Sequence, residues 1–338
     1  MFILATVIFA LACFALAAVV DIGGGVAFAQ QPQTGGPCPT NVLAPFGLAP
    51  DSHCAGTGCV VKFNNYRWWT AFTFNRNEGY YNGGLGTIFA PEHVFVDGRG
   101  DLHLRLAKDW NNNTQWAGAE AVLMFQADGT EANLGYGDYL ITAEIVKPDN
   151  ANFATFDPNV ALGMFTYERP ATGSQDNPAR EIDLAEISRW GWNHVTPVDC
   201  PFKGKINQFD NKTLCEGNAQ FALQDYTRHS GMVTRYDIGR TNKLTLVMKW
   251  REGQVTFEEY NGIHTLDDLP TPDFAWTTPP ELSPYVPTPR CERFHINLWL
   301  GNYYDTNWNH LPDFTPHAGP TDGQEVEVVI RSFEFQQP

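Results

Sequence analysis

The stretch "AREIDLAEISRWGWN", residues 179–193, places three carboxylates within six positions: Glu181, Asp183 and Glu186. Acidic and aliphatic residues alternate in its "EIDL" part, and successive side chains of a β-strand point to opposite faces. Glu181 and Asp183 therefore point to one face, while the aliphatic residues point to the other. This pattern predicts a half-buried strand with one packed face and one acidic face.

Glu186 does not follow this alternation. In a regular strand its side chain would lie on the aliphatic face, where an unpaired carboxylate is costly. A β-bulge at Leu184 or Ala185 would insert one extra residue and reverse the facing of the residues that follow. We therefore expect a bulge at this point, with all three carboxylates on one face. The alternative is a plain acidic strand exposed to solvent.

Short strand-like segments follow one another along the chain from about residue 60. They lie at residues 93–106, 135–146, 242–250, 253–262, 293–301 and 324–335. Helical patterns of ten or more residues are hard to find, and Asp97-Gly98 and Asn261-Gly262 stand where hairpin turns are expected. Many short strands without an internal repeat predict an all-β fold, a sandwich or jelly roll of two antiparallel sheets.

The N-terminal region differs from the rest. Residues 1–29 combine a long apolar run with "AFA" at their end, as an export signal does, which predicts a secreted, extracellular protein. The run is also long enough to span a bilayer, and an uncleaved membrane anchor is the alternative. Residues 30–60 are a lead-in rich in Pro, Gly and Cys, and we expect residues 61–338 to form one folded domain.

Charge and cysteine content restrict the partners and the compartment. The 338 residues include 38 acidic and 22 basic ones, and the net charge of −16 disfavours nucleic acid and anionic membranes. We expect a monomer with no protein partner and a neutral ligand, although the acidity could serve solubility alone. Without residues 1–29 an even number of cysteines remains, which predicts disulfides, and the short loop between Cys200 and Cys215 favours that pair.

Two carboxylates that face one cleft are the groups a glycosidase needs. One attacks the anomeric carbon, and the other donates a proton to the leaving oxygen. Retaining enzymes hold the two carboxyl groups about 5 to 5.5 Å apart, whereas Glu181 and Glu186 on a flat strand would have Cα atoms roughly 13 Å apart. The strand must therefore curve so that their side chains converge. Asp183, which lies between them, would raise the pKa of a neighbouring carboxyl by repulsion or by sharing a proton.

The motif "EIDLAE" resembles the E-x-D-x-x-E signature of glycoside hydrolase family 16, the laminarinase-like group whose catalytic strand carries a bulge. The segments "VFVDGRGDLHLRL", "GYGDYLITAEI", "LTLVMKWREGQVTFEEYNG" and "FHINLWLG" also look like strands of that family, so the resemblance covers about residues 65–336. It implies a concanavalin-like β-jelly roll with a concave sugar-binding cleft and a retaining double displacement. By motif position, Glu181 would be the nucleophile, Asp183 its electrostatic helper and Glu186 the general acid/base.

The segments that flank the motif depart from the family pattern. "NVALGMFTYERP" replaces a tryptophan-rich strand, and "NAQFALQDYTRH" offers no clear counterpart of a histidine that the family often carries. Three tryptophans are candidate platforms for a sugar ring, with core packing as the alternative for each: Trp190, Trp192 and Trp299. We interpret Trp68 and Trp69 as core or cleft wall.

Cofactor and metal motifs are weak in this chain. Asp97 and Asp101 stand among glycines, which could suit structural calcium, but a plain β-turn explains them better. The cysteines and histidines show no zinc-ligand spacing, and the motifs of serine hydrolases and nucleotide-binding loops do not occur. We therefore predict no metal site and no cofactor.

Together these features predict a secreted, endo-acting, retaining glycoside hydrolase. Its substrate would be a neutral β-linked polysaccharide, in the first place a β-1,3- or mixed β-1,3/1,4-glucan. Two alternatives remain open: a transglycosylase, in which a sugar hydroxyl replaces water, and a lectin-like carbohydrate-binding protein on the same fold.

Overall fold

The computed structural model describes nine stretches of the chain: residues 54–55, 58–70, 89–109, 112–157, 159–167, 181–188, 218–225, 230–300 and 319–338. In these stretches the secondary structure is β-strand with short 3-10 turns at Pro91–His93, Phe153–Thr155 and Pro280–Tyr285. No helix in this part of the chain is long and apolar enough to cross a membrane. The predicted export signal, residues 1–29, lies outside the described residues.

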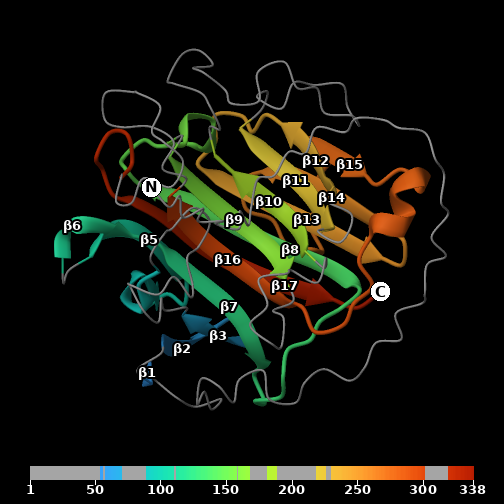
Figure 1. Cartoon of the computed structure of the whole chain (residues 1–338), viewed down its shortest axis with the longest axis horizontal. Coiled ribbons are helices and arrows are strands. Elements are labelled where there is room, and N and C mark those ends of the chain that lie inside the picture. The colour runs from blue at the N-terminus through green and yellow to red at the C-terminus, as the bar shows by residue number, and fades with distance from the viewer. Residues whose placement is uncertain are drawn as a thin grey trace, which may run out of the picture.

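The strands form two antiparallel sheets (Figure 1). The nine-stranded sheet runs in the order β1 (Cys54–Ala55), β2 (Gly58–Phe63), β3 (Tyr66–Thr70), β7 (Ala119–Gln126), β16 (Arg293–Leu300), β9 (Val160–Tyr167), β10 (Glu181–Ile187), β11 (Ala219–Asp225) and β12 (Ser230–Tyr236). The eight-stranded sheet contains β15 (Phe274–Thr277), β14 (Gln254–Asn261), β13 (Lys243–Arg251), β8 (Gly137–Lys147), β17 (Val326–Gln336), β5 (Leu102–Asp109) and β4 (Val94–Val96), and β6 (Asn112–Ala117) pairs with β5.

The chain passes repeatedly from one sheet to the other. Strands β3, β7, β9 and β16 belong to the nine-stranded sheet, whereas β5, β8, β13 and β17 belong to the eight-stranded one. Because of these crossings, neighbours in a sheet are often distant in sequence, and β16 lies between β7 and β9. The predicted all-β jelly roll of two antiparallel sheets is confirmed, and each strand-like segment identified in the sequence contains a strand.

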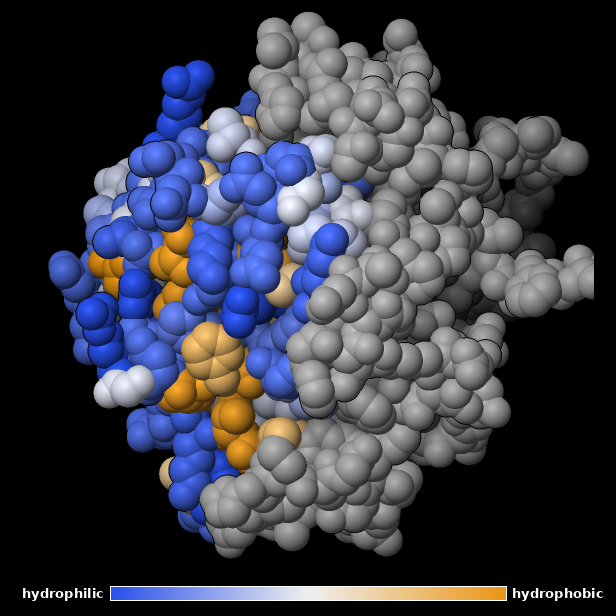
Figure 2. Space-filling view, turned by 90° about the vertical axis from the view of Figure 1, so that its left-hand side faces the viewer, coloured by the Kyte–Doolittle hydropathy of each residue, from blue (hydrophilic) through white to orange (hydrophobic). Residues whose placement is uncertain are grey.

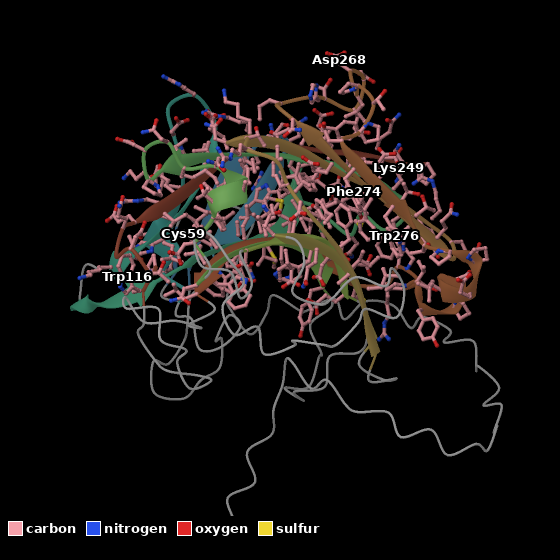
Figure 3. All side chains as sticks on the ribbon, turned by 90° about the horizontal axis from the view of Figure 1, so that it is seen from above. Cys59, Trp116, Lys249, Asp268, Phe274 and Trp276 are labelled. Atoms are coloured by element: carbon pink, nitrogen blue, oxygen red, sulfur yellow. The ribbon has the colours of Figure 1, made fainter. Side chains whose placement is uncertain are left out.

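The hydrophobic core fills the space between the two sheets (Figure 3). Each sheet contributes every second side chain of its strands, as a two-layer sandwich requires. Trp68 of β3 and Ile182 of β10 meet Tyr139 of β8 and Trp250 of β13 in one buried cluster. Phe274 and Trp276 of the edge strand β15 pack at one side of this core (Figure 3).

Turns follow the sequence prediction in one hairpin and differ in another. Asp97 begins the β4–β5 turn, where its Oδ1 accepts hydrogen bonds from the backbone N–H groups of Arg99 at 2.8 Å and Asp101 at 3.0 Å. The plain β-turn predicted there is confirmed. The tight β13–β14 hairpin instead turns at Gly253, which has a φ of 66°. Asn261 is the last residue of β14, and Gly262 begins a longer connection to β15, which pairs antiparallel with β14. The pair thus lies between neighbouring strands, but it does not form a two-residue turn.

The surface is largely polar, as Figure 2 shows for one side of the molecule. Ile263 is the one large hydrophobic residue that is exposed in the stretches described above. It belongs to the connection after β14, where Leu266 and Leu269 pack on the outer face of the eight-stranded sheet. That face is therefore partly covered by the chain itself. Cys59 and Cys291 each belong to a disulfide bond, whereas the favoured Cys200–Cys215 pair lies outside the described residues.

Candidate active site

Strand β10 carries the predicted bulge. Along β11, the partners of Asp183 and Glu186 are Ala222 and Gln220, which are only two positions apart. Leu184 and Ala185 thus span a single partner position. The pairing with β9 shifts at the same point, between Asp183 and Ala185. The bulge expected from the spacing of the three carboxylates is confirmed.

The bulge places all four aliphatic residues of β10 in the core. They are fully buried between the sheets: Ile182, Leu184, Ala185 and Ile187. Glu181, Asp183 and Glu186 therefore lie on the other side, on the outer face of the nine-stranded sheet. Asp183 is buried, with 1% of its surface exposed, while Glu181 and Glu186 are partly exposed. Two accessible carboxylates thus flank a buried one.

Glu186 is held by a side chain of the neighbouring strand. Gln220 lies opposite Glu186 in the β10–β11 register and donates a hydrogen bond from its Nε2 to the Oε2 of Glu186. The Gln220 side chain is buried, and its Oε1 has no hydrogen-bond partner. The amide therefore fixes the carboxylate of Glu186 and leaves one acceptor oxygen unused.

A row of side chains continues from Glu186 across the sheet in the other direction. Glu186 lies opposite Gly163 of β9, Gly163 opposite Asn297 of β16, and Asn297 opposite Glu120 of β7. These strands lie side by side in Figure 1. A Cβ on Gly163 would come within 2.4 Å of the Oδ1 of Asn297, so only glycine leaves this amide its place. With strands about 4.8 Å apart, the row from β7 to β11 spans roughly 19 Å.

Three oxygens of this row are buried and lack a hydrogen-bond donor: Glu120 Oε2, Asn297 Oδ1 and Gln220 Oε1. Buried polar atoms are normally paired, because an unpaired one costs about 1 to 3 kcal/mol. All three can only accept hydrogen bonds, and sugar hydroxyls are donors. A carbohydrate laid across the strands would supply the missing donors.

His295 adds an ionisable group on the same face. Its Nδ1 is 3.0 Å from the Oε1 of Glu120, and both side chains are buried. Its ring stacks on Phe165 of β9, with ring centroids 4.9 Å apart, and meets the edge of Tyr167 at 5.7 Å. Phe165 in turn lies opposite Asp183. The sequence analysis did not identify this histidine, which β16 brings to the acidic face.

The predicted tryptophans have different positions. Trp299 lies on the same outer face but packs with Phe89 and Ala161 and is only 5% exposed, which favours the packing alternative over an open platform. Trp68 is a core residue, whereas Trp69 packs with Val122 and others on the outer face. Two further candidates lie outside the described residues: Trp190 and Trp192.

Charged groups elsewhere form structural contacts. The backbone hydrogen bond from Asp101 lowers the pKa of Asp97, and Asp101 itself pairs with Arg331. In the portion of the chain that the structure describes, no three His, Cys, Asp or Glu side chains cluster closely enough to suggest a metal site. The separation of the carboxyl groups of Glu181 and Glu186, and the concave cleft, remain predictions.

Comparisons with known proteins add a structural likeness. No protein-family model and no curated protein matches the chain. It is similar to the solved structure of a lichenase, a prokaryotic β-1,3-1,4-glucanase from a mouse hindgut metagenome, with 15% identity, a TM-score of 0.45 and coverage of 82% of this chain and 96% of that one. The Bacillus licheniformis β-glucanase is similar at 16% identity and a TM-score of 0.45, with coverage of 84% of this chain and 100% of that one.

The laminarinase catalytic domain from Thermotoga maritima is also similar, with 13% identity, a TM-score of 0.47 and coverage of 82% of this chain and 94% of that one. Likenesses at these identities and TM-scores carry no conclusion about the activity of this chain. The functional argument therefore depends on the strands and side chains described above.

Proposed function

We propose that this protein is a retaining, endo-acting glycoside hydrolase of a neutral β-linked polysaccharide. The observation that carries the proposal is the bulge in β10, which brings Glu186 to the face of Glu181 and Asp183, beside a row of unpaired acceptor oxygens. The alternative, a plain acidic strand exposed to solvent, does not explain why a bulge keeps Glu186 out of the core. The resemblance of "EIDLAE" to the family 16 signature supports the same assignment.

The roles of the carboxylates follow from double displacement. The carboxylate of Glu181 attacks the anomeric carbon and forms a glycosyl ester, while Glu186 donates its proton to the leaving glycosidic oxygen. Glu186 then takes a proton from water, whose oxygen attacks the same carbon and releases Glu181. Asp183, buried between them, would act through its charge. Gln220 would hold the Glu186 carboxylate in place for both proton transfers.

The substrate class follows from charge and hydrogen bonding. A net charge of −16 disfavours strongly anionic polymers, and the unpaired acceptors of the site suit hydroxyl donors. We infer a β-1,3- or mixed β-1,3/1,4-glucan as the first substrate to test. The proposal includes secretion through residues 1–29 and action as a monomer.

The test is hydrolysis of a panel of polymers by the full chain. Laminarin, lichenan, agarose and xyloglucan are incubated with the parent and with Glu181→Gln, and released reducing ends are measured. We expect release from one of the β-glucans by the parent and a loss of at least about a thousandfold in the variant, because the covalent step is removed. Binding of a polymer without release above the variant would contradict the enzyme and favour the lectin-like alternative.

A transglycosylase is distinguished in the same assay by its products. When water is the acceptor, the number of reducing ends rises. When a sugar is the acceptor, the chain lengths change while the number of reducing ends stays constant. Chromatography of products from a defined oligosaccharide, with and without added acceptor sugar, separates the two outcomes.

A further inference from the structure

The Glu120–His295 pair has no role in the double displacement. Both residues lie on the acidic face of the nine-stranded sheet, since their chain neighbours Ala119, Ala121, Phe294 and Ile296 point into the core. Both are buried, with 5% of Glu120 and 8% of His295 exposed, and a contact of 3.0 Å joins them. An ionisable pair kept on a buried part of a candidate binding face needs a reason beyond packing, because its desolvation is costly.

The contact between the two residues fixes the tautomer of the neutral imidazole. If the neutral ring carried its proton on Nε2, two acceptors, Nδ1 and the Glu120 carboxylate, would face each other. The neutral ring therefore carries its proton on Nδ1, and this N–H group donates a hydrogen bond to the Oε1 of Glu120. Nε2 is then an acceptor in neutral His295 and a donor in the imidazolium. Protonation thus changes Nε2 of His295 from a hydrogen-bond acceptor to a donor.

The charged and titratable groups near His295 lie on four strands. From β7 it faces Glu120, from β9 the phenol of Tyr167, and on β16 the next side chain of the same face is Arg293. The guanidinium of Arg293 is paired with Glu131 at 2.7 Å. On β10, Asp183 lies beyond the ring of Phe165, which covers one face of the imidazole.

We propose that Glu120 and His295 form a proton-controlled recognition dyad that determines which oxygen of a sugar is bound. The unpaired Oε2 of Glu120 accepts a sugar hydroxyl, and protonated His295 donates from Nε2 to an oxygen that has no hydrogen, such as a ring or glycosidic ether oxygen. The neutral imidazole cannot make this second bond, so that saccharide binding is weaker when His295 carries no extra proton. This inference rests on the proposed function, because it assigns specificity within the same site.

The first experiment measures KM and kcat separately between pH 5 and 8 on an oligosaccharide of the polymer that the parent cleaves. We expect the parent KM to be about fivefold higher at the upper end of this range than at the lower end, the effect of one lost hydrogen bond. His295→Gln should give a KM that does not vary with pH, and Glu120→Gln a raised KM with kcat within about threefold of the parent. His264→Gln is the matched control, because this histidine lies on the connection after β14, in the other sheet, where its ring contacts the carbonyl of Asn261.

A parent KM that stays flat, or a dependence that survives in His295→Gln, would overturn the inference. Since a buried histidine can be needed for folding, a second measurement uses no His295 variant. The inactive Glu181→Gln, Glu186→Gln protein is titrated calorimetrically with the oligosaccharide at about pH 7 in two buffers of different ionisation enthalpy. Net proton uptake on binding is expected, and zero uptake contradicts the dyad.

The two proposals fail separately. Hydrolysis with a flat KM and no proton uptake leaves the glycosidase standing and removes the dyad. Binding with proton uptake but without hydrolysis removes the enzyme and leaves the dyad as part of a lectin-like site. Absence of both hydrolysis and binding rejects both.

Discussion

Gln220 donates a hydrogen bond from its side-chain amide to the Oε2 of Glu186, across the β10–β11 pairing and directly beside the bulge. The bulge turns Glu186 to the acidic face, and the amide then fixes the direction of its carboxylate. In the proposed mechanism this carboxylate transfers a proton twice, so its orientation matters in both half-reactions.

Replacing Gln220 by methionine keeps the volume of the side chain and removes the donor. We expect kcat on the polysaccharide to fall about 10- to 100-fold, because a general acid that is poorly oriented loses much of its effect. Gln254→Met, on the exposed start of β14, is the control and should match the parent. A Gln220→Met protein with the parent kcat would show that Glu186 needs no such support.

Gly163 makes room for the amide of Asn297. Gly163→Ala places a methyl group too close to the Oδ1 of Asn297 for both groups to keep their positions. We expect a loss of stability of about 1 to 3 kcal/mol from overpacking, and a raised KM, because Asn297 must leave the acceptor row. Gly98→Ala is the matched control, as its Cβ would meet nothing within 4 Å. Thermal unfolding and kinetics of the two variants should therefore differ clearly.

The buried carboxyl group of Glu259 makes the stability of the folded protein depend on pH. It lies between the sheets on β14, is 2% exposed, and its Oε1 has no hydrogen-bond partner. Burial, with repulsion from Asp273, raises the pKa of this carboxyl from 4.5 to about 7. The folded protein thus binds the proton more tightly than the unfolded chain. The resulting stabilisation is complete below pH 4.5 and is lost as the pH rises through about 7.

Glu259→Gln should therefore flatten the stability profile. We expect the parent to lose roughly 1 to 3 kcal/mol more than the variant between pH 5 and 8, because the variant has no charge to bury. Denaturant unfolding at several pH values measures the two slopes. Glu281→Gln, at an exposed position, should keep the parent slope. Equal slopes for the parent and Glu259→Gln would mean that Glu259 is not the buried acid responsible.

The two accessible carboxylates should respond differently to the leaving group. Glu186→Gln should lower kcat on the polysaccharide about 10²- to 10⁴-fold, because the leaving oxygen of this substrate needs a proton. It should recover most of its glycosylation rate on a dinitrophenyl glycoside, whose leaving group needs none. Glu181→Gln should recover nothing, because its loss removes the attacking group. Pre-steady-state release of dinitrophenol measures both, and equal behaviour of the two variants would contradict the assigned roles.

Much of the fold and the central strand could be predicted from the sequence, because these depend on local alternation. The alternation of acidic and aliphatic residues in "EIDLAEI" predicted the bulge, because one extra residue is needed to keep Glu186 out of the core. The strand-like segments likewise predicted two antiparallel sheets. The hairpin at Gly253 lies between two predicted strands, residues 242–250 and 253–262, whereas the turn signal Asn261-Gly262 leads into a longer connection.

The neighbours of the carboxylates could not be predicted in the same way. Glu120, Asn297 and Gln220 share a row with Glu186 only because the strand order is β7, β16, β9, β10, β11. Alternation tells which face a side chain occupies, but strand order and register decide what it meets. His295 stands in β16, a strand buried on both faces, where the available signal was the alternation of Arg293, His295 and Asn297 with apolar residues.

The proposed mechanism requires that the bulge brings Glu181 and Glu186 together as a retaining pair over one sugar. The distance between their two carboxyl groups in an experimental structure with a bound oligosaccharide tests it most directly. We expect a separation of about 5 to 5.5 Å, with both groups on the same side of the sheet and the scissile bond between them. A separation of about 6.5 to 9.5 Å, which leaves room for a water and inversion, or carboxyl groups on opposite faces, would contradict it.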